Sequence, residues 1–183
     1  MRYRNITVSG LPGAGSTTLA ENLARSLDWN FVSLGEEMRR QAINLGWVDG
    51  RKLVHHDATA YGEEFDRKTD LGVREKLSRE KDQVIEGWLA GFFAQGVEGV
   101  LKILVKCGEE ERVRRVARRD EVEMGKAQEQ MRHRVAVNVK KWRQMYGKID
   151  FLRPDLYDVV VNTSRYNEEE AVAIGLERLG YGS

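Results

Sequence analysis

A glycine-rich stretch near the N-terminus constrains the fold of this chain more than any other feature. It reads Gly10-Leu11-Pro12-Gly13-Ala14-Gly15-Ser16-Thr17-Thr18. Residues 4–9, just before it, are short and rich in β-branched side chains, which predicts a strand. Residues 17–27, just after it, carry leucine and alanine at helical spacing, which predicts a helix. Strand, loop and helix therefore follow one another in the order that a phosphate-binding loop requires.

The spacing of Gly10, Gly15 and Thr17 matches the Walker A frame, in which glycine, four residues and glycine precede lysine and a hydroxyl residue. Small residues let backbone N–H groups curve around a polyphosphate, and the helix N-terminus adds its positive end. A glycine-rich turn without a ligand is the alternative. We expect the loop to bind ATP, and Thr17 to ligate Mg²⁺, through a run of eight candidate residues: Gly10, Pro12, Gly13, Ala14, Gly15, Ser16, Thr17 and Thr18.

Ser16 stands where the Walker frame has its lysine. That lysine supplies a point charge to the terminal phosphates of ATP. A serine hydroxyl donates one hydrogen bond and neutralises no charge. Another cation must therefore compensate, or phosphoryl transfer is weak.

Strands and helices alternate along the rest of the chain. Further strands are predicted at about 31–32, 83–85, 100–105 and 159–162, and several of them are continuously apolar. Such strands indicate a parallel sheet that is covered on both faces. We therefore expect a three-layer α/β fold with five parallel strands. The length of 183 residues, with two prolines and no proline-rich linker, favours one domain over residues 1–183.

A helix predicted at about 126–145 carries Met131, Val135, Asn138, Trp142 and Met145 on one face. An apolar stripe of this kind usually packs against a core. We therefore expect Trp142 to be a core residue and not a ligand.

Several stretches, in their order and spacing, resemble the archaeal-type (type 2) cytidylate kinases of the nucleoside monophosphate kinase group. They include residues 6–13, 32–39, 84–87, 101–106 and 156–163. The resemblance implies a P-loop kinase with acceptor-binding helices at about 36–80 and a short arginine-rich lid at about 115–134. It implies transfer of the γ-phosphoryl group of ATP to a nucleoside monophosphate, with CMP and dCMP favoured. Some members of that family also carry a hydroxyl residue at the lysine position.

The resemblance implies roles for four arginines. Arg39 matches an arginine that grips the acceptor phosphate, a task that suits a guanidinium because it can bond two oxygens at once. Arg115 and Arg119 lead into the lid and Arg134 leaves it, which makes them the catalytic candidates and the natural substitutes for the missing lysine. For Arg115 and Arg119 the alternative is a solvated helix face paired with Glu110 or Glu111.

The remaining candidates lie on the acceptor side. Asp66 and Asp70 match acidic positions near the acceptor base, with surface solvation as the alternative. Glu86 ends a buried strand, where open α/β sheets bind ligands. It would hold Mg²⁺ through water or orient the acceptor, unless it only caps the turn at Gly87. Trp88 replaces a family arginine; it either stacks on a planar acceptor or packs in the core.

A basic pair that the family tends to show after the Asp70 position is replaced by Leu71-Gly72. Together with Trp88, this departure indicates a diverged acceptor site. It leaves two alternatives to CMP phosphorylation open. One is a kinase for a different small acceptor, and the other is a nucleotide-binding regulatory or assembly module with weak or no kinase activity.

The charge distribution favours a small anionic ligand. The 30 lysines and arginines nearly cancel the 29 aspartates and glutamates, but residues 112–143 hold 11 basic and 4 acidic side chains, a local charge of +7. The rest of the chain carries −6, which disfavours long polyanions such as nucleic acid. No apolar run reaches the length of a membrane span, and the single cysteine, Cys107, fits a reducing cytoplasm.

Overall fold

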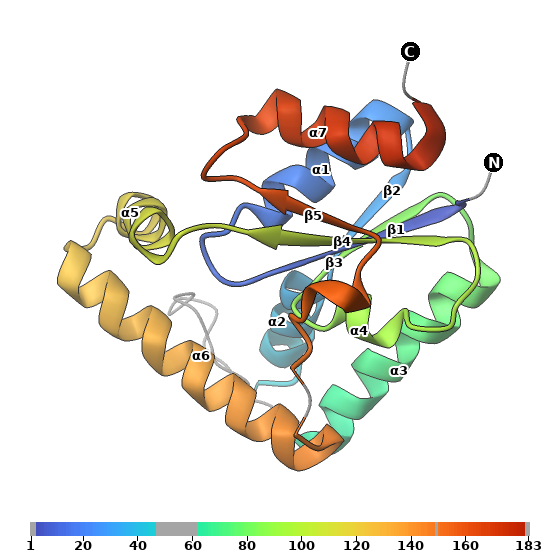
Figure 1. Ribbon diagram of the computed structural model, residues 1–183. Helices are drawn as coiled ribbons and strands as arrows, with labels where there is room; N and C mark the ends of the chain where they lie inside the picture. The colour runs from blue at the N-terminus through green and yellow to red at the C-terminus, as the bar shows by residue number, and fades with distance from the viewer. Residues whose placement is uncertain (1–2, 47–61, 149, 182–183) are drawn as a thin grey trace.

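The computed structural model describes residues 3–46, 62–148 and 150–181, and within them five strands form one parallel sheet (Figure 1). The strands are β1 (Asn5–Gly10), β2 (Asn30–Ser33), β3 (Gln83–Glu86), β4 (Val100–Lys106) and β5 (Val159–Asn162). Their order is β2-β3-β1-β4-β5, and every pairing is parallel. The predicted five-stranded α/β class is confirmed, and all five carboxyl ends meet at one edge of the sheet.

Helices cover both faces of this sheet. They are α1 (Ser16–Leu27), α2 (Leu34–Asn44), α3 (Glu63–Arg79), α4 (Ala90–Phe93), α5 (Glu109–Asp120), α6 (Met124–Tyr146) and α7 (Glu168–Leu176). In Figure 1, α1 and α7 lie on one face, whereas α3 and α4 lie on the other. Helices α1 and α6 match the helices predicted at 17–27 and about 126–145. Helix α4 and the 3-10 turn Pro154–Leu156 were not predicted, because elements this short show no periodicity.

Two apolar clusters hold these layers together. Ile6 and Val8 of β1 pack with Leu23 of α1 on one face, and Ile85 of β3 packs with Leu77 of α3 on the other. All five side chains are fully buried. Their burial fixes the strand ends that carry the polar residues of the site.

Helices α5 and α6 form a separate hairpin with a small core of their own, which includes Val116 and Met131. From this hairpin α6 runs to the N-terminal half of α3 (Figure 1). The side-chain contacts that join these helices include Lys141 to Asp66 and Tyr146 to Asp70. The predicted acceptor region, 36–80, therefore borders α6, although its residues 47–61 lie outside the described part of the chain.

Candidate active site

The glycine-rich loop joins β1 to α1 in the conformation that its sequence requires. Gly13 and Gly15 have φ of 77° and 89°, in the left-handed region that favours glycine. At Gly13 there is also no room for a side chain, since a Cβ there would lie 2.5 Å from the carbonyl oxygen of Arg112. The loop thus packs directly against the first turn of α5.

Two side chains brace this loop from outside. The Thr163 hydroxyl donates to the carbonyl of Ala14 at 2.7 Å, and the Arg112 guanidinium donates to the carbonyl of Pro12 at 3.3 Å. Neither was singled out as a site residue from the sequence. Since both act through backbone carbonyls, no local sequence pattern marks them.

A cleft of about 880 Å³ opens beside the loop and brings nearly all of the predicted site residues together. From the loop it is lined by Gly10, Pro12, Gly13, Gly15, Ser16, Thr17 and Thr18, and from elsewhere by Arg39, Asp66, Asp70, Glu86, Trp88, Arg115, Arg119 and Arg134. Ala14 is the exception, because the side chain of this loop residue is buried and does not line the cleft.

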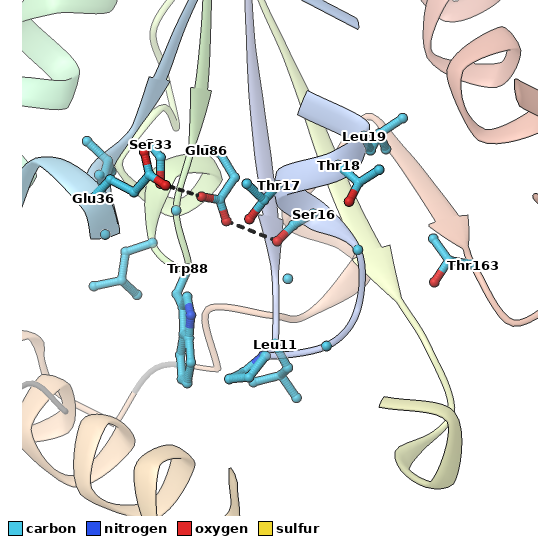
Figure 2. Close-up of a pocket in the computed structure, with 18 of the residues that line it drawn as sticks. Leu11, Ser16, Thr17, Thr18, Leu19, Ser33, Glu36, Glu86, Trp88 and Thr163 are labelled. Atoms are coloured by element: carbon cyan, nitrogen blue, oxygen red, sulfur yellow. Dashed lines mark hydrogen bonds between the residues drawn. The ribbon is translucent and has the colours of Figure 1, made fainter. Parts of the chain in front are cut away.

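Glu86 lies at the carboxyl end of β3, buried between two serines (Figure 2). Ser16 donates its hydroxyl to one carboxylate oxygen and Ser33 donates to the other, both at 3.0 Å. Burial raises the pKa of Glu86, against the lowering effect of the two serine hydrogen bonds. The alternative of a cap for Gly87 is wrong, since the Gly87 N–H donates to the carbonyl of Val8.

Ser33 was missed by the sequence analysis, although a signal for it existed. It ends β2 and pairs in register with Glu86 of β3. The rule that ligands bind at the carboxyl ends of parallel strands applies to Ser33 as well as to Glu86.

Trp88 follows β3 and points into the cleft near the phosphate loop (Figure 2). Its ring meets that of Trp142 edge-on, with centroids 5.3 Å apart, and the Arg134 guanidinium lies 5.4 Å from its centroid. Trp142 also packs edge-on against Phe151. The expectation that Trp142 is a core residue is wrong in one respect, because this half-buried side chain also lines the cleft.

Asp66 and Asp70 lie one turn apart on α3 and face α6. Both are buried, with 2% and 8% of their surface exposed, so the alternative of surface solvation is wrong. Asp66 forms an ion pair with Lys141 at 2.5 Å, and Asp70 accepts a hydrogen bond of 2.5 Å from the Tyr146 hydroxyl. Burial raises the pKa of Asp66, and it raises the pKa of Asp70 to about 7.

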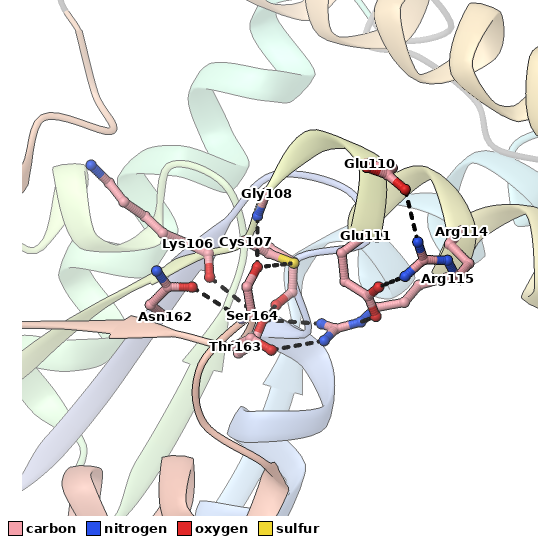
Figure 3. A network of polar contacts seen from close by, with 11 residues as sticks. Lys106, Cys107, Gly108, Glu110, Glu111, Arg114, Arg115, Asn162, Thr163 and Ser164 are labelled. Carbon is pink, nitrogen blue, oxygen red and sulfur yellow. Dashed lines mark hydrogen bonds and ion pairs between the residues drawn. The ribbon is translucent and has the colours of Figure 1, made fainter.

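The lid arginines lie in the cleft wall with protein partners. Arg115 donates to Glu111, to the Thr163 hydroxyl and to the Thr163 carbonyl, at 3.0, 3.0 and 2.8 Å (Figure 3). Its pairing with Glu111 is the one that the solvated-face alternative predicted. Arg115 nevertheless lines the cleft. Its guanidinium is bonded to Thr163, and the Thr163 hydroxyl is in turn bonded to the Ala14 carbonyl of the phosphate loop. Arg119 pairs with its neighbour Asp120.

The two departures from the family pattern, at Trp88 and at Leu71-Gly72, lie in different parts of the structure. Trp88 lies in the cleft, whereas Leu71 has 61% of its surface exposed and is absent from the cleft lining. Only the first departure therefore changes the chemistry of the cleft.

Comparison with known proteins shows the family of this chain. Residues 5–165 match the cytidylate kinase-like family. The chain belongs to this family. A cytidylate kinase from Methanopyrus kandleri is 33% identical over 178 residues, an alignment that covers 92% of this chain and 89% of that protein. The resemblance found in the sequence is confirmed.

Solved structures agree on the fold. An uncharacterized protein from Eubacterium ventriosum aligns with a TM-score of 0.73 at 15% identity, covering 96% of this chain and 98% of that one. Shikimate kinase from Bacteroides thetaiotaomicron aligns with a TM-score of 0.61 at 17% identity, with the same coverage. Family and fold together identify a P-loop phosphotransferase of the nucleoside monophosphate kinase type. No helix in the described residues is long and apolar enough to cross a membrane.

Proposed function

We propose that this cytidylate kinase-like protein transfers the γ-phosphoryl group of ATP to a nucleoside monophosphate, with CMP and dCMP as the favoured acceptors. The proposal rests on one observation, which is that the residues assigned to ATP and the residues assigned to the acceptor line the same cleft. This cleft holds the phosphate loop together with a half-buried arginine, Arg39, an aromatic wall and two buried acids. Such a transfer requires two phosphate-bearing substrates side by side in one site.

The donor side consists of the loop and the start of α1. The N–H groups of the loop and the positive end of α1 suit the phosphates of ATP. The Thr17 hydroxyl and the Glu86 carboxylate supply oxygen ligands at the same end of the cleft, and oxygen ligands with a low carboxylate count suit Mg²⁺. When bound, Mg²⁺ would neutralise charge on the phosphate oxygens.

The charge that the Walker lysine would supply is assigned to Arg115, Arg119 and Arg134. In the transfer, an oxygen of the acceptor phosphate attacks the γ-phosphorus, and the bond from that phosphorus to the bridging oxygen of ADP breaks. Negative charge then spreads over the transferred group. Guanidinium groups in the cleft wall stabilise that charge in place of the lysine ammonium.

The acceptor side is assigned to Arg39, Trp88, Asp66 and Asp70. The Arg39 guanidinium would hold the acceptor phosphate, and the indole of Trp88 offers a face on which a base can stack. A buried carboxylate accepts hydrogen bonds, and the 4-amino group of cytosine donates them. Uracil has an oxo group at that position, so the acids favour cytosine. The relative from Methanopyrus kandleri is a cytidylate kinase, which supports the same acceptor.

A coupled assay with ATP and Mg²⁺ against CMP, dCMP, UMP and AMP tests the proposal. We expect ADP release to depend on the acceptor, with CMP or dCMP giving the highest kcat/KM. ATP binding without transfer to any of the four would contradict the proposal and favour a nucleotide-binding module.

The neighbours Arg39 and Arg40 offer a matched pair of variants for the acceptor side. Arg39 lines the cleft, whereas the side chain of Arg40 is 72% exposed and pairs with Glu37. Arg39→Ala should raise the KM for the acceptor about tenfold or more, since it removes a charge-assisted phosphate contact. Arg40→Ala should stay within about twofold of the wild type. Equal effects of the two substitutions would contradict the assignment.

A further inference from the structure

Helix α6 lines the cleft with three chemically different side chains at regular spacing. They are Arg134, Asn138 and Trp142. Residues four apart lie on one face of a helix, one above the other, and each step rises about 6 Å. Along this face of α6, the cleft is therefore lined first by a cation, then by a carboxamide and then by an indole.

Asn138 is the unexpected member of this row. It lies in the middle of a 23-residue helix, where asparagine is a poor helix former, and only 5% of its surface is exposed. A carboxamide has two donor and two acceptor positions, so it can bond within the protein and still face a ligand. Buried polar side chains that line a cleft fix the orientation and the identity of the ligand.

The surroundings of Asn138 suit a flat heteroaromatic ring. One turn along α6, Trp142 meets Trp88 at an angle of 69°, so the two indoles form an aromatic corner. In the same turn as Trp142, Lys141 forms an ion pair with Asp66, which holds α6 against α3 at this level. One turn in the other direction, Arg134 supplies the positive charge that suits a phosphate.

We propose that Asn138 reads the hydrogen-bonding edge of the acceptor base, which makes α6 an element of acceptor specificity as well as of the lid. This inference rests on the proposed function. On a cytosine, the carboxamide oxygen accepts from the 4-amino group and the carboxamide N–H donates to the ring nitrogen N3. The arginine and the tryptophan on either side place the phosphate and the ring plane, and they carry no information about that edge.

A substrate cycle separates base recognition from a structural role. The wild type and Asn138→Ala are assayed at saturating ATP with CMP and with the 4-deamino analogue of CMP, which lacks only the amino group. We expect the wild type to favour CMP by about tenfold or more in kcat/KM, because a site that is built to bond a polar group rejects the analogue without it. In Asn138→Ala this preference should fall at least about fivefold, while the KM for ATP stays within about twofold.

The control is Gln144→Ala, on the same helix but exposed and outside the cleft lining, which should keep the wild-type preference. If Asn138→Ala does not fold, Asn138→Ser keeps a polar group without the paired donor and acceptor, and the same fall is expected. A CMP preference that survives in these variants, or that is absent from the wild type, overturns the inference while CMP phosphorylation still supports the proposed function. A wild type that phosphorylates no nucleoside monophosphate overturns both.

Discussion

Ser16 and Glu86 form a hydrogen-bonded pair at the position where the Walker frame has its lysine. The Ser16 hydroxyl satisfies one oxygen of the buried carboxylate, and the Ser33 hydroxyl satisfies the other. Under the proposed function, the positive charge that the serine does not supply would come from the cleft-lining arginines of α5 and α6.

The buried acid Asp70 gives a residue-level prediction that depends on pH. Burial raises its pKa from 3.8 to about 7 in the folded protein. Between these pH values the folded state binds a proton that the unfolded state releases, so the contribution of Asp70 to stability falls as the pH rises from about 4 to about 7. Asparagine does not titrate, and its carbonyl can still accept from Tyr146. In Asp70→Asn, the Tm relative to the wild type should therefore become more positive between pH 5 and pH 8.

Melting curves of both proteins at unit steps of pH measure this difference. Glu64→Gln, an exposed acid on the same helix, is the control, and its Tm difference should stay flat. A flat difference for Asp70→Asn as well would show that Asp70 titrates normally in the folded state.

At the scale of elements, we expect alanine substitutions at two glycines to change the stability of the fold in opposite directions. Gly13→Ala places a methyl group 2.5 Å from the carbonyl oxygen of Arg112, at a φ that L residues rarely adopt, and should destabilise the fold by about 1–3 kcal/mol. Gly125→Ala, in α6, meets open space and should stabilise it by up to about 1 kcal/mol. Urea unfolding of both variants checks the signs, and a stabilised Gly13→Ala would contradict the packing of this loop.

The regular elements could be predicted because their signals are local. The Walker spacing and the apolar strands identified the loop, the sheet and the longer helices. The partners of the site could not be predicted in the same way. Ser33 and Thr163 act on residues more than 50 positions away, and Asn138 was read as part of an apolar stripe because periodicity does not distinguish a core from a cleft wall.

At the scale of the whole molecule, basic and acidic side chains from distant parts of the sequence line one cleft. The arginines of residues 112–143 that line the cleft belong to α5 and α6, and acids of α3 and the end of β3 line the same cleft. A ligand with phosphates at one end and a hydrogen-bond donor at the other fits this arrangement. Binding of such a ligand should tie α5 and α6 to the rest of the molecule.

This coupling predicts a ligand-dependent melting temperature. At ligand concentrations of about 100 times the Kd, binding to the folded state adds about 2.7 kcal/mol. For a chain of 183 residues, this corresponds to a rise in Tm of about 5–10 °C. Differential scanning fluorimetry with ATP and Mg²⁺ measures the rise, which should be smaller with ATP alone. No rise at millimolar ATP with Mg²⁺ would contradict donor binding.

The brace between Thr163 and Ala14 also has a consequence for the order of events during synthesis. The two residues are 149 positions apart, so the phosphate loop leaves the ribosome long before the hydroxyl that holds it. The strand that positions this hydroxyl, β5, follows the other four strands of this sheet in the sequence and takes an edge of the sheet. A nascent chain that ends before Asn162 therefore has the nucleotide motif without its support, and we expect firm ATP binding only after β5 has joined the sheet.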